Sequence, residues 1–254
     1  MTPVRLLGLE FADVDVPAAA ALIAARDPAA RFGYVVTPNA DHLVRLHRQP
    51  ALRPIYTGAM VRVLDSRVVA RVARLLGVTA PRVCPGSDLV HALLAGCFGA
   101  TQPITIIGLR PTWLPALRAR YGLAALAHFD PPMAFWRDPA ALRATVAFVI
   151  AHPARFVFLA VGSPGQEILA YAIARSGQVS GIGLCVGAAL EFLVGARRRA
   201  PRWMQRAGLE WLHRLGSEPR RLAGRYLRDD PLIFRLLLRE RLALARQARQ
   251  NFPG

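Results

Sequence analysis

The stretch Phe156–Glu167, FVFLAVGSPGQE, joins an apolar run to a glycine turn and to the start of a helix-patterned segment. The run Phe156–Val161 is short and rich in β-branched and aromatic residues, which is typical of a buried strand. Gly162 and Gly165 flank the turn, where glycine is often needed only for its freedom to adopt positive φ. The same geometry exposes backbone N–H groups at a helix N-terminus, which is a natural seat for a diphosphate. The stretch predicts a strand-turn-helix unit, and both a structural and a phosphate-binding role of the turn stay open.

Units of this kind recur along the chain up to about residue 190. The expected strands are Arg5–Leu9, Tyr34–Thr37, Val61–Leu64, Ile104–Ile107, Ala124–His128, Phe156–Val161 and Gly181–Val186. The expected helices are Ala18–Ala25, Asp41–Arg48, Val68–Leu76, Asp88–Phe98, Pro115–Tyr121, Pro139–Ala151 and Gln166–Ala174. This alternation predicts an α/β, Rossmann-like domain over residues 1–195, with a mostly parallel sheet and helices on both faces. Residues 196–254 are expected to form a basic, amphipathic helical appendage.

The charge of the chain is strongly positive and unevenly placed. The 254 residues are 54% apolar, which suits one large core, and the formal net charge is +17. The sequence has no Lys, and residues 196–254 hold 15 arginines against 5 acids. Arginine pairs bidentately with phosphate oxygens, so the excess suggests phosphate, nucleic acid or an anionic lipid surface as a partner. Codon composition is the alternative reason for so many arginines.

Several classes of protein lack support in the sequence. Cys84, Cys97 and Cys185 are scattered, which supports neither a disulfide framework nor a zinc site. The longest charge-free apolar stretch, Leu93–Leu109, is interrupted by glycines and a proline, so no membrane span is expected. The first residues lack the features of a signal peptide, which indicates the cytoplasm. Dinucleotide-binding glycine patterns, P-loops, nucleophile elbows and H-E-x-x-H are all missing.

Polar residues follow several of the expected strands, at the sheet edge where ligands bind in such folds. Asn39 and Asp41 come after the second strand, Asp65 directly after the third, and Gly108 after the fourth. A carboxylate at the end of a buried strand is partly desolvated, which raises its pKa toward that of a useful base. Asp65 is therefore a candidate catalytic base. The alternatives are capping roles for Asp65, Asn39 or Asp41 at the helices that follow.

The segment Ala196–Leu227 alternates aromatic residues with arginines at helical spacing. On a helix over Trp203–Leu215, the two tryptophans fall on an apolar half, and so does Arg214. An arginine placed there either snorkels from a membrane-facing side or points at a buried anion, and we favour the anion. Residues 232–249 predict a second amphipathic helix, which either lies on anionic lipid or packs on the body.

Several segments recur together, in the same order, in one family of proteins: Thr37–Leu43 (TPNADHL), Asp65, Gly86–Leu89 (GSDL), Gly162–Glu167 (GSPGQE), Arg199–Met204 (RAPRWM), Gly208–Leu212 (GLEWL), Glu218–Leu222 (EPRRL) and Arg225–Leu227 (RYL). On these pieces the chain resembles the WecG/TagA/CpsF bacterial glycosyltransferases, or glycosyltransferase family 26. The resemblance covers nearly the whole chain up to about residue 230, and the tail signature is its most specific part.

The resemblance implies an inverting, metal-independent hexosyltransferase without a cofactor. It implies transfer from a UDP-sugar to a saccharide on a polyprenyl diphosphate, for exopolysaccharide or other cell-surface glycans, at the inner face of the plasma membrane. It also implies Asp65 as the base, with Thr37 and Asn39 facing the reacting sugar. The expected donor-binding residues are Gly86, Ser87, Asp88, Gly108, Gly162, Gln166 and Glu167, and the expected diphosphate ligands are Arg214, Arg221 and Arg225.

The chain departs from the family pattern at Ser66, Arg67 and Gly165, where the family usually has glycine, a small apolar residue and lysine. These departures leave the donor sugar open. They also keep a non-catalytic, membrane-docking subunit as an alternative. A nucleic-acid-binding protein is a further alternative, although the tail aromatics fall on an apolar half and not on a basic face. The apolar surface expected on the tail leaves room for a homo-oligomer as well as for lipid.

Overall fold

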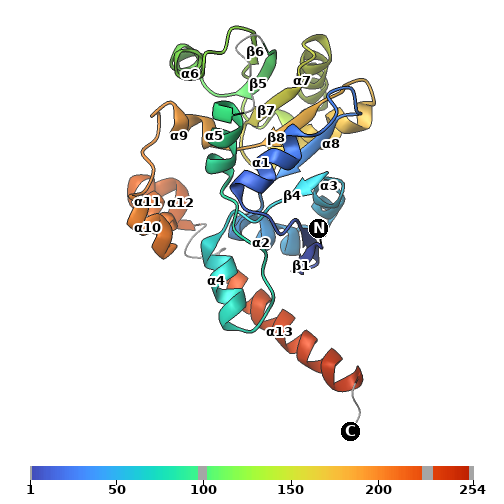
Figure 1. Cartoon of the computed structure of the whole chain (residues 1–254), viewed down its shortest axis with the longest axis vertical. Helices are drawn as coiled ribbons and strands as arrows, with labels where there is room; N and C mark the ends of the chain where they lie inside the picture. Colours follow the sequence, from blue (N-terminus) through green and yellow to red (C-terminus); the bar gives the residue numbers. More distant parts are fainter. Residues whose placement is uncertain (1, 97–101, 225–230, 252–254) are drawn as a thin grey trace.

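The computed structural model describes residues 2–96, 102–224 and 231–251 and is built on one parallel sheet of six strands (Figure 1). The strand order is β4-β3-β8-β7-β5-β6, and all five pairings are parallel. The strands are β3 (Gly33–Val36), β4 (Val61–Arg62), β5 (Ile104–Gly108), β6 (Leu126–Phe129), β7 (Phe156–Ala160) and β8 (Ile182–Cys185). The predicted α/β, Rossmann-like fold with its parallel sheet is confirmed.

Both faces of the sheet are buried, and β7 shows why. Phe156 and Phe158 point into one apolar cluster, and Val157 and Leu159 point into the other. A strand with two buried faces needs apolar residues at every position, which explains the continuous run in the sequence. One cluster is closed by α2 (Ala40–Arg48), α4 (Arg67–Leu75), α7 (Pro139–Ala151) and α8 (Gly165–Ser176). The other is closed by α1 (Val16–Ala24), α5 (Gly86–Gly96), α6 (Leu114–Tyr121) and α9 (Ala189–Leu193).

The N-terminal segment differs from the prediction. Instead of one strand over Arg5–Leu9, β1 (Val4–Leu6) and β2 (Leu9–Phe11) form an antiparallel hairpin. Its turn is made by Leu7 and Gly8, with φ of 50° and 76°. Leucine at positive φ is unusual, so the pattern gave no turn signal. Two short helices, α3 (Arg53–Thr57) and α9, also lie where no element was expected.

The appendage is helical, but its first helix is shorter than predicted. The expected helix over Trp203–Leu215 is divided into α10 (Arg202–Ala207) and α11 (Glu210–Ser217). Gly208 between them adopts φ of 75°, the left-handed conformation that ends helices. A third short helix, α12 (Pro219–Gly224), follows.

The last helix, α13 (Leu232–Asn251), starts on the body and extends away from it (Figure 1). Its first turns pack against α2 and α4 through Ile233, Leu236 and Leu237, which are buried in the same cluster as one face of the sheet. The Glu240 carboxylate then accepts the Leu7 N–H, at 2.8 and 2.9 Å. Further along, Leu242 and Leu244 are exposed. Among the described residues, no helix is both long enough and apolar enough to cross a membrane.

Candidate active site

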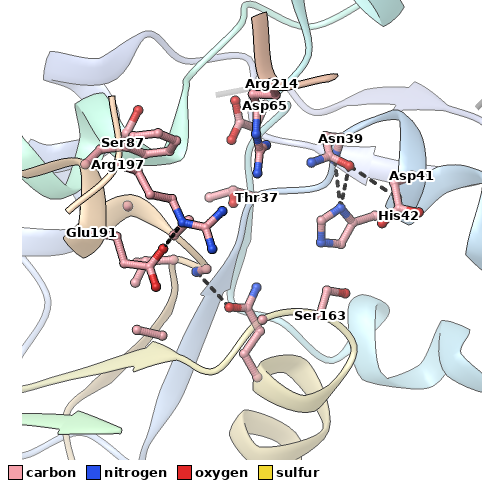
Figure 2. A pocket seen from close by; sticks show the side chains of 18 of the residues that line it. Thr37, Asn39, Asp41, His42, Asp65, Ser87, Ser163, Glu191, Arg197 and Arg214 are labelled. Carbon is pink, nitrogen blue, oxygen red and sulfur yellow. Dashed lines mark hydrogen bonds and ion pairs between the residues drawn. The ribbon is translucent and has the colours of Figure 1, made fainter. Parts of the chain in front are cut away.

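A cavity of about 1100 Å³ lies at the carboxyl ends of the sheet strands, where the appendage meets the body (Figure 2). Its wall contains residues that follow all six strands of the sheet, β3 to β8. The appendage supplies the rest of the wall. Of the site residues expected from the sequence, eight line this cavity: Thr37, Asn39, Asp65, Ser87, Gly108, Gly162, Gln166 and Arg214. The cavity therefore brings together residues from 37 to 214.

Asp65 lies in the cavity wall just beyond β4 and is not a helix cap. The residue after it, Ser66, is the N-cap of α4, and its hydroxyl accepts the Val69 N–H at 3.2 Å. Burial raises the pKa of Asp65 to about 6, although a hydrogen bond from the Gly86 backbone opposes the shift. The Glu210 carboxylate also raises this pKa, and His42 and Arg214 lower it. A carboxyl group with such a pKa is suited to proton abstraction near neutral pH.

Gly86 and Ser87 begin α5, so this helix starts two residues before the predicted Asp88 and Ser87 lies in its first turn. Gly86 is buried behind the cavity wall, and a Cβ there would lie 3.1 Å from Thr37 Oγ1 and 3.4 Å from Asp65 Oδ2. The glycine thus lets the end of α5 approach both side chains. Asp88, also expected at the donor, is not among the residues that line the cavity and forms an ion pair with Arg199.

Thr37 and Asn39 follow β3, and Asn39 rather than Asp41 caps α2. The Asn39 Oδ1 atom accepts the His42 N–H at 3.3 Å, and the Asn39 backbone nitrogen lies 3.3 Å from His42 Nδ1. Asp41 instead binds the Arg45 guanidinium at 2.7 Å. The capping alternative for Asn39 is therefore correct, and its side chain nonetheless lines the cavity.

The glycine turn after β7 places Gln166 in the cavity wall and Glu167 behind it. Gly162 has a φ of 76° and open space where a Cβ would be. Gln166 Oε1 accepts the Gly187 N–H at 2.8 Å, which ties the ends of β7 and β8 together. Glu167 is 1% exposed, so direct contact of its side chain with a nucleotide sugar is not what the structure shows.

Gly165, where the family usually has lysine, must be glycine because an aromatic ring lies against it. A Cβ at this glycine would lie 2.4 Å from Trp136 Cε3. Trp136 itself lines the cavity. The tryptophan therefore occupies space beside the N-terminus of α8, and only glycine fits beneath it.

Gly108, an expected donor-binding residue, is the last residue of β5 and pairs with Ala160 of β7. Its φ is 84°, and a Cβ would lie 2.7 Å from the Ala160 carbonyl oxygen of the neighbouring strand. His128 Nε2 lies 3.0 Å from the Gly108 carbonyl oxygen. The glycine thus allows β5 and β7 to stay close where they reach the cavity.

Arginines of the appendage form part of the cavity wall. Arg197 forms ion pairs with Glu191 and Glu218, and Arg199 with Asp88 and Glu210. Arg214 has no hydrogen-bond partner for its guanidinium among the side chains that the structure describes. The side chain of Arg221 and all of Arg225 lie outside the described residues, so their predicted roles stay predictions.

The residues of this wall that sequence reasoning missed include Trp136, Glu191, Arg197 and Arg199. The two arginines had a signal, because Arg197 lies two residues before the tail motif Arg199–Met204 and Arg199 is its first residue. Glu191 and Trp136 gave none, since neither follows a strand directly. Within residues 2–96, 102–224 and 231–251, no three His, Cys, Asp or Glu side chains are grouped so that they could hold a metal ion.

A comparison with known families gives a match to the model described as the glycosyl transferase WecG/TagA/CpsF family, over residues 4–247. The match includes the parallel sheet, the cavity with Asp65 and most of the appendage. It confirms the resemblance drawn from the motifs. The chain therefore belongs to the WecG/TagA/CpsF family and is a glycosyltransferase of cell-surface glycan synthesis, acting on a sugar donor and a glycan acceptor.

Proposed function

We propose that the protein transfers a hexose or N-acetylhexosamine-type sugar from a UDP-sugar to a saccharide carried on a polyprenyl diphosphate, with inversion and without a metal. The observation that carries this proposal is the position of Asp65 in the cavity wall, with its pKa raised to about 6 beside the cationic side chain of Arg214. A base and a cation at one cavity are the two elements that inverting transfer from a nucleotide sugar requires.

In this mechanism Asp65 accepts the proton of the acceptor hydroxyl. The hydroxyl oxygen forms a bond to the anomeric carbon while the bond from that carbon to the UDP oxygen breaks. The electron pair of the broken bond leaves with the diphosphate, whose added negative charge must be stabilised. Arg214 supplies positive charge at the cavity, and Arg221 and Arg225 are proposed to act with it.

The acceptor's lipid carrier requires the protein to work at a membrane surface, and we place it on the cytoplasmic face. Two features support peripheral association. Trp203 and Trp211 are 65% and 38% exposed on the appendage, so their rings do not complete the core of the body. The outer part of α13 exposes Leu238, Leu242 and Leu244 among arginines. Apolar side chains among arginines are typical of helices that lie on anionic lipid.

The test of the reaction uses the full-length protein and a panel of UDP-sugars. Ligand-induced thermal stabilisation first identifies the donors that bind, and each is then supplied with a synthetic polyprenyl-diphosphate-linked monosaccharide. We expect one donor class to be transferred in the presence of a chelator, with release of UDP and an inverted linkage by NMR. Transfer that needs added metal, or retention at the anomeric carbon, would contradict the proposed chemistry.

The test of the membrane contact is flotation with vesicles containing an anionic phospholipid. We expect the wild-type protein to float and a Leu238, Leu242 and Leu244 to Ser triple variant to float less, because burial of each leucine is worth about 1.5–3 kcal/mol. A matched control replaces the exposed Leu75 of α4 with Ser. Equal flotation of the triple variant and wild type would remove α13 from the contact.

A further inference from the structure

His42, on the first turn of α2, has each ring nitrogen facing an oxygen acceptor. The residue is 9% exposed. Its Nδ1 atom lies 2.7 Å from Asn39 Oδ1, and its Nε2 atom lies 3.4 Å from Glu167 Oε1. Asn39 and Glu167 come from opposite sides of the ring, one from the end of β3 and one from α8. Asn39 makes two contacts with Nδ1, and the one from its Oδ1, at 2.7 Å, is shorter than the one from its backbone N–H, at 3.3 Å. We therefore place a proton on Nδ1 toward Asn39 Oδ1 and a second on Nε2 toward Glu167.

Glu167 is an ionised partner despite its burial. Desolvation alone raises the pKa of this carboxyl, but hydrogen bonds from His42 and Gln166 outweigh it and hold the pKa below its usual range. The Gln166 Nε2 group donates to Glu167 Oε1 at 2.8 Å. His42 Nε2 approaches the same oxygen, Oε1, so the amide and the ring both face one atom of an ionised carboxylate.

The Asn39 amide has only one orientation compatible with these contacts. Its oxygen accepts from the backbone N–H of His42 as the cap of α2, and the same oxygen faces the His42 ring. The amide nitrogen is therefore the end that is free to face the cavity, on the side of Thr37 and Asp65 (Figure 2). Asn39 thus presents a hydrogen-bond donor, not an acceptor, to a ligand.

We propose that Glu167 and His42 form a buried ion pair that fixes the Asn39 amide with its NH₂ group toward the donor sugar. This inference rests on the proposed function. His42 and Glu167 are positioning residues, since they act through Asn39, and Asn39 is the residue that touches substrate. It reassigns Glu167, which the family resemblance implied as a ligand of the nucleotide sugar.

The groups around the pair also fit this role. Arg45 donates to Ser163 Oγ at 2.6 Å, so its guanidinium is bound next to the pair of His42 and Glu167. The ring of Tyr56 meets the His42 ring edge-on, with centroids 6.2 Å apart. The other titratable groups that interact electrostatically with His42 or Glu167 are Tyr34, Asp65 and Cys185.

A kinetic double-mutant cycle tests the positioning role. We expect His42→Gln and Asn39→Ala each to lower kcat about 100-fold, which is the scale of a misplaced contact in an active site. KM for the UDP-sugar should change by less than about twofold in His42→Gln, and the double variant should be no slower than Asn39→Ala alone. His47→Gln, exposed on the same helix, is the matched control and should keep wild-type kcat. Additive losses in the double variant would overturn the inference.

The protonation of the ring is measured separately, by ¹⁵N-edited NMR of the full-length protein with histidine labelling. We expect both ring nitrogens of His42 to be protonated at neutral pH, and Glu167→Gln to return the ring to a single proton. A singly protonated ring in the wild-type protein would overturn the ion pair. This measurement needs no turnover, so it tests the ion pair independently of sugar transfer. If no UDP-sugar is transferred, the proposed function fails, but the NMR result still shows whether the pair exists.

Discussion

Asp65 depends on two neighbours of opposite charge that lie on one helix of the appendage. Glu210 begins α11 and raises the Asp65 pKa, and Arg214 is four residues further on and lowers it. Burial is the largest single contribution to the pKa shift of Asp65, larger than that of either neighbour. The acidity of the base is therefore set partly by a segment far from it in the sequence.

This arrangement predicts two opposite shifts in the pH profile. Asp65 must be ionised to accept a proton, so kcat/KM should fall as the pH drops through about 6. Glu210→Gln removes a negative neighbour and should move the midpoint of this acidic limb to lower pH. Arg214→Gln removes a positive one and should move it to higher pH, whatever else it does to the rate. Midpoints that stay in place in both variants would show that another group controls the limb.

Gly86 predicts a loss of activity without a large loss of stability. In Gly86→Ala the new methyl group would press on Thr37 Oγ1 and Asp65 Oδ2. We expect kcat/KM to fall at least about tenfold while the free energy of unfolding changes by about 1–3 kcal/mol, as in other overpacked sites. Steady-state kinetics and urea denaturation measure the two effects.

The control for this variant lies at the other end of the same helix. A Cβ at Gly96 meets nothing within 4 Å, so Gly96→Ala should keep full activity and add up to about 1 kcal/mol of stability from helix propensity. If Gly86→Ala were as active as Gly96→Ala, Gly86 would have no part in placing the base.

At the scale of elements, the sequence predicted the strand-turn-helix units because their signals are local. Each parallel strand is an apolar run, and each following turn carries Gly, Asn, Ser or Pro. The hairpin at Leu7 was missed because its turn uses a leucine at positive φ. The break between α10 and α11 was missed because Gly208 lies inside a pattern with otherwise helical spacing.

The amphipathic pattern of α13 could not decide where this helix lies. Its amphipathic pattern fitted both a lipid-facing helix and a helix packed on the body, and its first turns do pack on the body. We therefore expect Leu237→Ala, at a fully buried position, to cost about 2–5 kcal/mol in urea denaturation. Leu244→Ala, at a position that is 42% exposed, should stay within about 0.5 kcal/mol of wild type. Equal costs would mean that the two halves of α13 are packed alike.

At the scale of the whole molecule, the cavity is shared between the α/β body and the appendage. Thr37, Asn39, Asp65 and Gln166 come from the sheet edge, and Arg199 and Arg214 come from the tail. The sequence predicted the first group well because strand ends in parallel sheets converge on one edge. Of the second group it predicted Arg214 but not Arg199. Which tail side chains reach the cavity depends on how short helices pack, and the ion pairs of Arg197 and Arg199 have no sequence pattern.

Single-turnover kinetics with Asp65→Asn test whether Asp65 is the base of the sugar transfer. The amide keeps the shape of the side chain but cannot take a proton. With the UDP-sugar and lipid-linked acceptor prebound, the rate of transfer should fall about 100- to 10,000-fold, the range of general-base catalysis. UDP-sugar affinity should stay within about twofold, and Asp27→Asn, at an exposed position, should transfer at the wild-type rate. Transfer by Asp65→Asn at the wild-type rate would show that Asp65 is not the base.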